Sequence, residues 1–359
     1  HSSKFETVVV IGGGFAGLTT ALSLWSFKPR SLIILIEPRS KFVFNPLLYE
    51  LLSGELQSWE IAPSYRSLLS GKGIILVEEN AENIDFQQKI VSMTSGQEIS
   101  FDKLVLATGA RPDSFEIPGV EQYALKFHQL KDVVILKELI SKVNSLSYKK
   151  QSLILVGAGS TGVELACKIS DLLDEHVEIC LIEAGNRVLP HGQSFNQEQI
   201  DNALKRRDIK LYLRTRVVEV KKDIVQLETY IENNKEFISL NHAGLIWTAG
   251  VKPALLNGIP SSCLDNGKIL IEPTMQVKGI ADVFAIGDIS LDKENPYLMT
   301  AQVAMQQGQL VARNLVSALE GKDLESFHFQ DRGEMLSLGI GDATITGMGL
   351  TLSGPFAYK

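Results

Sequence analysis

Residues 7–18 read TVVVIGGGFAGL, an apolar run that ends in a glycine-rich turn and continues into a helical pattern. Gly12, Gly14 and Gly17 have the spacing GxGxxG. In this spacing the first glycine makes a tight turn, the second lets a pyrophosphate approach the backbone, and the third lets the helix pack on the strand. Free N–H groups and the positive end of the helix favour an anion there. Taken alone, such a turn is a weak signal, since glycine-rich turns also occur for structural reasons.

Two later segments give this turn a context. A second apolar run, LIILI at 32–36, ends in Glu37, which follows Gly12 by 25 residues. An acidic residue at this distance can accept hydrogen bonds from ribose hydroxyls. A third run, KLVL at 103–106, leads into ATGARP at 107–112. Together these segments predict a dinucleotide-binding unit.

The same series then occurs a second time. The run SLILV at 152–156 enters the turn GAGSTG at 157–162, and EICLI at 178–182 ends in Glu183, 26 residues after the first glycine of that turn. The series closes with GLIWTAGVKP at 244–253, which is similar to the ATGARP segment. An ordered repeat of four features predicts a second dinucleotide-binding unit.

A late strand, VFAIGD at 283–288, indicates how the two units share the chain. If the chain returns there to complete the first unit, Asp288 lies by the ribityl and pyrophosphate part of its ligand. We therefore expect an α/β protein with two Rossmann-like domains of the FAD/NAD(P)-linked disulfide-reductase-like type. The expected ranges are an FAD domain at 4–115 and 271–325, an inserted NAD(P)H domain at 116–270, and a C-terminal segment at 326–359.

Composition excludes several other classes of protein. With 359 residues, of which 45% are hydrophobic and 21% charged, the chain is long enough for two or three globular domains. A net charge of -7 argues against a nucleic-acid partner. The three cysteines, Cys167, Cys180 and Cys263, form no CxxC pair and the six histidines show no ligand spacing, so we expect a reducing compartment and no metal site. No apolar run is long enough to predict a membrane-spanning helix.

Two further segments make the chain similar to a known family. FVFNPLLYE at 42–50 resembles a loop that carries a proline near the flavin, and TAQVAMQQ at 300–307 matches the AQxAxQQ signature that lines a flavin and quinone pocket. With the repeated turns, they resemble the type II NAD(P)H:quinone oxidoreductases, the non-proton-pumping alternative NADH dehydrogenases. YELLSGE at 49–55, WEIAP at 59–63 and GEM at 333–335 resemble the cyanobacterial and plastid branch associated with demethylphylloquinone reduction.

The resemblance implies an activity and a location. It implies hydride transfer from NAD(P)H to flavin N5 and two-electron reduction of a quinone, such as demethylphylloquinone, another naphthoquinone or plastoquinone. In this family, amphipathic helices that follow the segment near Gly354 and Pro355 anchor the enzyme to one membrane leaflet, so we expect the natural protein to continue beyond Lys359. The implied location is peripheral, on the cytoplasmic face of a thylakoid or plasma membrane in a cyanobacterium-like cell. A homodimer is left open.

Most of the expected site residues are binders, because the cofactors carry hydride chemistry and the protein positions them. For FAD we expect Gly12, Gly14, Phe15, Ala16, Gly17, Glu37, Pro38, Asn45, Pro46, Ala81, Thr108, Gly109, Gly287, Asp288 and Gln302. For the nicotinamide nucleotide we expect Gly157, Gly159, Thr161, Gly162, Glu183 and Gly250.

Three residues are candidates for the chemistry of quinone reduction, which consumes protons. Glu164 occupies an acidic position of the family near the place where nicotinamide and quinone meet, but a helix N-terminal acid that only satisfies the helix dipole would look the same. Gln302 and Gln306 lie four residues apart and share a helix face, so they can donate to flavin or quinone carbonyls. The alternative for the two glutamines is a solvated polar face.

The choice of nucleotide depends on Glu183. A carboxylate beside the ribose accepts from the 2′-hydroxyl of NADH and repels the 2′-phosphate of NADPH, so NADH is the expected donor. Arg187 lies four residues later and can pair with a phosphate. NADPH therefore stays open as a second donor.

Other electron acceptors and another function class compete with this interpretation. Disulfide reductases and sulfide:quinone oxidoreductases need cysteines near the flavin, and residues 40–60 contain none. A ferredoxin- or rubredoxin-like carrier protein is acidic and would bind to a basic patch on this protein. The negative net charge of the chain does not favour such a patch. A redox sensor whose flavin does not turn over is the alternative outside enzymes.

Overall fold

The computed structural model describes residues 5–192, 194–337, 343–347 and 350–354. The chain divides into two compact units, each of which is assembled from three separate stretches. The first unit contains His1–Val43, Ala62–Arg111 and Lys252–Gln330, and the second contains Phe44–Ile61, Pro112–Val251 and Asp331–Lys359. Each unit is described by itself below.

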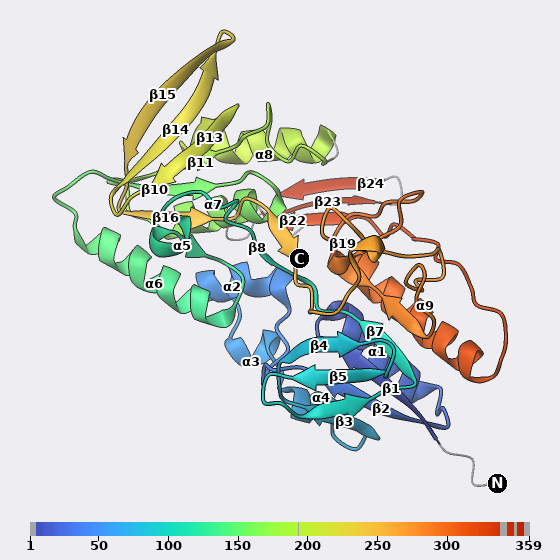
Figure 1. The fold of residues 1–359 in the computed structure, drawn as a ribbon. Coiled ribbons are helices and arrows are strands. Elements are labelled where there is room, and N and C mark those ends of the chain that lie inside the picture. The colour runs from blue at the N-terminus through green and yellow to red at the C-terminus, as the bar shows by residue number, and fades with distance from the viewer. Residues whose placement is uncertain (1–4, 193, 338–342, 348–349, 355–359) are drawn as a thin grey trace. The chain divides into compact units, whose positions relative to one another are not determined.

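The first unit is built on a parallel sheet with the strand order β20, β7, β1, β2, β3. Figure 1 labels β1, β2, β3 and β7 of this sheet. Its strands are β1 (Glu6–Ile11), β2 (Ser31–Ile36), β3 (Ile74–Val77), β7 (Lys103–Leu106) and β20 (Val283–Ala285). Each strand is a nearly continuous apolar run, as expected for strands that are buried on both faces. The late strand β20 pairs with β7, so the chain does return to complete the first sheet.

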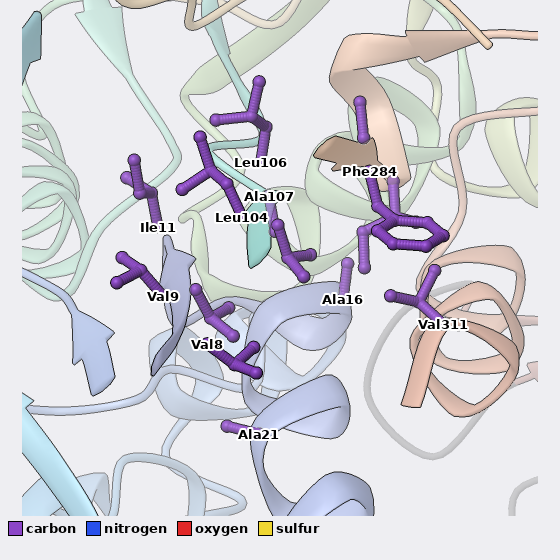
Figure 2. Packing of buried hydrophobic residues seen from close by; sticks show 14 of the residues in the cluster. Val8, Val9, Ile11, Ala16, Ala21, Leu104, Leu106, Ala107, Phe284 and Val311 are labelled. Carbon is purple, nitrogen blue, oxygen red and sulfur yellow. The ribbon is translucent and has the colours of Figure 1, made fainter. Parts of the chain in front are cut away.

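Two long helices of the first unit lie close together. They are α1 (Phe15–Ser26), which follows the first glycine-rich turn, and α9 (Ala301–Leu319). A methyl group on Gly308 of α9 would lie 2.6 Å from the carbonyl oxygen of Ala16, so only glycine allows this approach. Figure 2 shows part of the core around them, where Phe284 of β20 and Val311 of α9 belong to one buried cluster with strand residues such as Val8.

Shorter elements complete the first unit. These are α4 (Tyr65–Leu69), β4 (Ala81–Asp85), β5 (Ile90–Met93), β6 (Glu98–Ser100), η2 (Ser261–Cys263), β18 (Leu264–Asp265), β19 (Lys268–Leu270), η3 (Gly287–Ile289) and β21 (Ser290–Leu291). The strands β4, β5 and β6 form an antiparallel sheet, and β19 pairs with both β18 and β21.

The second unit repeats the parallel sheet, with the order β12, β11, β10, β16, β9. Its strands are β9 (Leu125–Lys126), β10 (Gln151–Val156), β11 (Val177–Ile182), β12 (Lys210–Tyr212) and β16 (Gly244–Trp247). The helix α7 (Ser160–Leu172) follows the second glycine-rich turn, as α1 follows the first. The expected fold class, with two Rossmann-like units, is confirmed.

Further elements surround this second sheet. They are η1 (Asn45–Leu47), α2 (Leu48–Ser53), α3 (Ser58–Ile61), α5 (Val120–Tyr123), α6 (Leu130–Ser145), α8 (Ser194–Arg206), β13 (Thr215–Val220), β14 (Ile224–Ile231), β15 (Asn234–Asn241), β22 (Glu334–Ser337), β23 (Ala343–Gly347) and β24 (Leu350–Gly354). The strands β13–β15 and β22–β24 form two antiparallel sheets. The short strands β8 (Ala110–Pro112) and β17 (Val251–Pro253) mark two of the places where the chain passes from one unit to the other.

The borders of the units differ from the ranges that we expected in four places, one of which is that residues 112–115 fall in the second unit rather than the first. Residues 44–61 fall in the second unit rather than the first, because α2 packs on α6 and α7. Residues 252–270 fall in the first unit, because β19 pairs with β21 and Ile269 joins the core of that unit. The C-terminal stretch of the second unit begins at Asp331. Residues 355–359, from which we expected the chain to continue toward a membrane anchor, lie outside the described residues.

A buried histidine in the second unit gives a pH-dependence of folding. His242 is 7% exposed, and its Nε2 lies 3.1 Å from the carbonyl oxygen of Lys221. Burial lowers the pKa of the imidazole from its ordinary 6.5, although contacts with Lys221 and Asp223 oppose the shift. The folded protein therefore keeps this imidazole neutral at a pH at which the unfolded chain binds a proton.

We expect the free energy of unfolding to decrease as the pH falls from about 7 through about 6.5, with a slope of at most about 1.4 kcal/mol per pH unit from this group. Above that range the imidazole is neutral in both the folded and the unfolded state, so His242 no longer contributes to the pH-dependence of the free energy of unfolding. His242→Gln should flatten the profile, which urea unfolding at several pH values measures. His191→Gln, at an exposed histidine of the same unit, is the control. Equal slopes in the wild type and His242→Gln would contradict the prediction.

Candidate dinucleotide sites

The three glycines of the first turn have two different roles in the structure. Gly12 has φ +99°, and a methyl group on it would lie 2.2 Å from the carbonyl oxygen of Ala107. A methyl group on Gly17 would lie 1.7 Å from the carbonyl oxygen of Gly12. A methyl group on Gly14 would meet no atom within 4 Å. Gly12 and Gly17 are therefore needed for the fold, whereas Gly14 keeps a space open where a ligand can reach the backbone.

The second turn repeats this division. Gly157 has φ +104° and would bring a methyl group to 2.9 Å from Ala249, and a methyl group on Gly162 would lie 1.7 Å from the carbonyl oxygen of Gly157. Gly159 again leaves open space. Both turns thus present a cradle at the start of a helix, which is the geometry that binds a pyrophosphate.

Glu37 lies at the end of β2 and is 3% exposed. Its Oε1 accepts a hydrogen bond from Arg39 Nε at 2.8 Å, and the Tyr65 hydroxyl lies 3.1 Å from the same oxygen. The hydroxyl makes its shorter contact, 2.6 Å, with the carbonyl oxygen of Gly13, and it has one proton to donate. Burial raises the pKa of Tyr65, so the phenol stays protonated. The hydrogen bonds that the described residues make to the Glu37 side chain all go to Oε1.

Glu183 occupies the matching place at the end of β11 and is held more completely. Its Oε2 accepts the N–H of Ala158 at 2.8 Å, and its Oε1 accepts the N–H of Gly185, also at 2.8 Å. Arg187, which we considered as a phosphate partner, is exposed. The carboxylate of Glu183 is therefore fixed beside the second glycine-rich turn.

Asp288 lies in a turn beside a cavity of the first unit. Burial raises the pKa of its carboxyl group, and the coulombic effect of Lys268 opposes the shift. Further residues line the same cavity, among them Gly287, Tyr297, Leu298, Met299, Thr300 and Gln307. Thr300 also begins α9, where its hydroxyl accepts the N–H of Val303 at 3.2 Å. The cavity thus combines a carboxyl group with the N-terminus of a long helix.

The remaining expected residues are spread over both units. Phe15 and Ala16 form the first turn of α1, Pro38 follows Glu37, and Ala81 begins β4. Thr108 donates its hydroxyl proton to the carbonyl oxygen of Ala254, and Gly109 has φ +70°. Asn45 and Pro46 lie in η1, which belongs to the second unit, and Asn45 Oδ1 is a buried acceptor with no partner among the described residues.

Gly250 has a structural reason to be glycine. It has φ +86°, and a methyl group on it would lie 2.5 Å from the ring of Phe115. The glycine-rich end of the second unit is thus explained by packing inside that unit, with or without a ligand.

The two glutamines of the AQxAxQQ segment have different surroundings. Gln302 lies in the first turn of α9. Gln306 donates from Nε2 to the carbonyl oxygen of Gln330 at 2.9 Å, and its Oε1 accepts the N–H of Gln330 at 3.0 Å. Both ends of the Gln306 amide are used by one backbone position.

Glu164 lies in the first turns of α7 and is 9% exposed. It faces a residue that the sequence did not single out, Tyr49 of α2. Burial raises the pKa of Tyr49 well above its ordinary range, and the coulombic effect of Glu164 raises it further. The Tyr49 hydroxyl also bonds Thr161, and its ring stacks on Phe127 with centroids 5.6 Å apart. Tyr49 therefore stays a neutral phenol beside an acid.

One turn further along α7 lies a second pair that sequence reasoning missed. Lys168 is fully buried and forms an ion pair with Glu55, whose side chain is 17% exposed. Ser53, at the end of α2, also donates to Glu55. The sequence did contain one signal for this ion pair, namely a lysine within the apolar pattern of α7. A buried ammonium group needs a partner of opposite charge.

The described residues contain neither a candidate metal site nor a candidate membrane-spanning helix. No cluster of three or more histidine, cysteine, aspartate or glutamate side chains with metal-ligand geometry occurs in the described part of the chain. None of the helices within the same ranges is long and apolar enough to cross a membrane.

Residues 6–308 match the family described as pyridine nucleotide-disulphide oxidoreductase. Demethylphylloquinone reductase NdbB from Synechocystis sp. is 33% identical over 98% of this chain and 89% of its own length. The alternative NAD(P)H-ubiquinone oxidoreductase C1, chloroplastic/mitochondrial, from Arabidopsis thaliana is also 33% identical, over 99% of this chain and 76% of its own length.

A solved structure shows the same fold at lower identity. NDH2 from Plasmodium falciparum in complex with NADH is 19% identical and superposes with a TM-score of 0.87, covering 98% of this chain and 92% of that one. The two-unit architecture is therefore one that is known to hold NADH in another protein.

Proposed function

We propose a function for a chain that belongs to the pyridine nucleotide-disulphide oxidoreductase family and, within it, to the type II NAD(P)H:quinone oxidoreductases. The protein oxidises NAD(P)H and reduces a quinone, with FAD as its cofactor. The observation that carries this proposal is the pair of open cradles at Gly14 and Gly159, each at the start of a helix and each followed by a fixed acid at the end of the next strand. The two cradles fit two dinucleotides. When bound, FAD accepts a hydride from the nicotinamide and passes two electrons to the quinone.

The first unit fits FAD. Gly14 leaves room for a pyrophosphate, Glu37 is proposed to accept from a ribose, and Asp288 lies beside the cavity at the start of α9. Phe15, Ala16, Gly12, Gly17, Pro38, Ala81, Thr108, Gly109, Gly287 and Gln302 complete the proposed set. Asn45 and Pro46 are included in the proposed set by resemblance alone.

The second unit fits the nicotinamide nucleotide. Gly159 provides the open cradle, Glu183 is the fixed acid, and Gly157, Thr161, Gly162 and Gly250 shape the surrounding backbone. Because both oxygens of Glu183 are held by backbone N–H groups, the carboxylate cannot swing away from a 2′-phosphate. This rigidity supports NADH as the preferred donor.

Three side chains are proposed to serve the reaction itself. Glu164 is a buried acid beside the neutral phenol of Tyr49, so a proton can be held there near the nicotinamide end of the site. Gln302 is proposed to donate to a flavin or quinone carbonyl. Gln306 belongs to the same proposal, but its amide must exchange its bonds with Gln330 before it can bind a ligand.

By resemblance, the proposal also includes a place in the cell and an assembly. The protein would lie peripherally on the cytoplasmic face of a membrane and pair with a second copy. Flotation of the full natural chain with vesicles of anionic lipid and analytical ultracentrifugation test these two points separately.

The activity test is steady-state turnover with NADH or NADPH against menadione, a ubiquinone analogue and demethylphylloquinone. We expect turnover with at least one naphthoquinone and bleaching of the flavin by NADH without oxygen. If NADH bleaches the flavin but no quinone is turned over, a quinone is not the electron acceptor, and this result would favour a carrier protein as the acceptor. A flavin that does not bleach would favour a sensor.

Glu183→Gln tests the choice of nucleotide. Glutamine has one acceptor oxygen, so it loses either the Ala158 or the Gly185 bond and removes the charge that repels a 2′-phosphate. We expect the ratio of kcat/KM for NADH to that for NADPH to fall about tenfold, which corresponds to about 1.4 kcal/mol.

Glu178→Gln is the matched control for this experiment. Glu178 lies on the same strand but pairs with Lys210 at the surface, so its ratio should not change. If the ratio of the two kcat/KM values is unchanged in Glu183→Gln, this carboxylate does not discriminate between the 2′-hydroxyl of NADH and the 2′-phosphate of NADPH.

A further inference from the structure

A buried hydrogen bond joins Gln307 of α9 to the turn that carries Asp288. Gln307 is 2% exposed, and its Oε1 accepts the N–H of Gly287 at 2.7 Å. Gly287 has φ +73°, in the region that favours glycine, so the backbone of this turn has an uncommon shape. Asp288 follows directly. The bond from Gln307 therefore fixes the backbone from which the Asp288 carboxyl group projects.

Both α9 and this turn also contact α1, the helix that begins at the first cradle. A methyl group on Gly308, the next residue of α9, would lie 2.6 Å from the carbonyl oxygen of Ala16, and one on Gly287 would lie 3.3 Å from the Ala16 side chain. The turn, α9 and the first turn of α1 thus meet in close contact. Gln307 holds Asp288 at a fixed position relative to the start of α1.

Gln307 also lines the cavity beside Asp288, whereas the bonds of its neighbour Gln306 lie elsewhere. Gln306 holds the backbone of Gln330 with both ends of its amide, at the point where the chain leaves the first unit. Two adjacent glutamines of one segment therefore have separate tasks.

We propose that Gln307 is a positioning residue for FAD, which keeps the Gly287–Asp288 turn in the shape that binds the cofactor. This inference rests on the proposed function, because it requires FAD in the first unit. Without the acceptor, the turn relaxes in the apoprotein and its N–H is hydrated. FAD binding then has to bury that N–H again without a partner, and the cost is seen as a loss of FAD affinity.

The test compares three variants by titration of the apoprotein with FAD, followed by quenching of flavin fluorescence. Gln307→Met keeps the length of the side chain and removes the acceptor, and we expect FAD to bind about tenfold more weakly. Gln307→Glu keeps an acceptor oxygen for the Gly287 N–H, so it should bind FAD more tightly than Gln307→Met, but the buried carboxyl group should keep its affinity below that of the wild type. Gln309→Met makes the same change at an exposed position of the same helix and should leave the affinity unchanged.

Folding is checked by the thermal midpoint of each apoprotein. If Gln307→Met does not fold, Gln307→Glu decides the question, because a purely structural role that depends on the neutral amide would not be rescued by a carboxylate. Wild-type affinity in Gln307→Met, or an equal loss in Gln307→Glu and Gln307→Met, would overturn the inference. A wild-type protein that binds no FAD would instead overturn the proposed function, and this inference with it.

Discussion

Gly17→Ala is expected to destabilise the apoprotein by about 3 kcal/mol and to abolish FAD binding. The added methyl group would lie 1.7 Å from the carbonyl oxygen of Gly12, and neither atom belongs to a flexible side chain. The helix α1 must therefore move away from the strand that precedes it. Urea unfolding of the apoprotein and the absorbance of bound flavin measure the two effects.

Gly14→Ala is the matched variant of the same turn, and we expect the opposite pattern. Gly14 has an extended backbone, with φ -72° and ψ -163°, and its methyl group would meet no protein atom. The free energy of unfolding of the apoprotein should stay within about 1 kcal/mol of the wild type. The flavin should be lost all the same, because the methyl group fills the space reserved for the pyrophosphate.

The pair of variants thus separates fold from ligand. Retention of flavin by Gly14→Ala would show that no ligand approaches the backbone there. Equal destabilisation by the two substitutions would contradict the division of the glycines into two roles. Gly162→Ala and Gly159→Ala allow the same comparison for the second unit, with NADH in place of FAD.

Glu55→Gln is expected to destabilise the protein by about 3 kcal/mol, the second large effect. It removes the carboxylate that pairs with Lys168, an ammonium group with no exposure to water. Lys168→Met should cost less, because Glu55 is partly exposed and can be hydrated. The double variant should recover part of the loss, because neither charge remains.

Denaturant unfolding of the three variants measures these differences. The control is Glu178→Gln, which breaks a surface pair with Lys210 and should cost less than about 1 kcal/mol. If Glu55→Gln costs no more than this control, the buried pair does not fasten α2 to α7. If the double variant is worse than both single variants, the two charges do not act as a pair.

The architecture could be predicted from the sequence because it depends on local patterns that occur twice. Apolar runs such as 7–11 and 152–156 ended in glycines whose spacing is dictated by close backbone contacts, and those contacts are present in both units. The return of the chain at 283–285 was also predictable, since a strand and a Gly-Asp pair remained after the second unit was complete.

The parts that could not be predicted depend on side-chain contacts between distant segments. Nothing in the sequence near residues 44–61 shows that α2 packs on the second unit, because the signal is an ion pair across more than a hundred residues, from Glu55 to Lys168. Tyr49 was named only as part of two segments that carry the resemblance, and its interactions with Glu164 and Thr161 could not be predicted. Gln306 was selected by its spacing from Gln302 and Gln307 was not, and only the structure shows that Gln306 holds Gln330 whereas Gln307 holds Gly287.

The interleaving of the two units has a consequence for how the protein is made on the ribosome. The first sheet lacks β20 until residue 285 has been synthesised, and the second unit takes up its last described strand at residues 350–354. The first unit therefore cannot finish folding until most of the second has been translated, and the second receives its last strands only after the first is complete, although domains usually fold in turn from the N-terminus. The nascent chain keeps the edge of β7 exposed while residues 112–251 of the second unit are synthesised, until β20 has emerged. Shielding of this edge by a chaperone during the interval, followed by release once α9 has emerged, is the folding route that this topology favours.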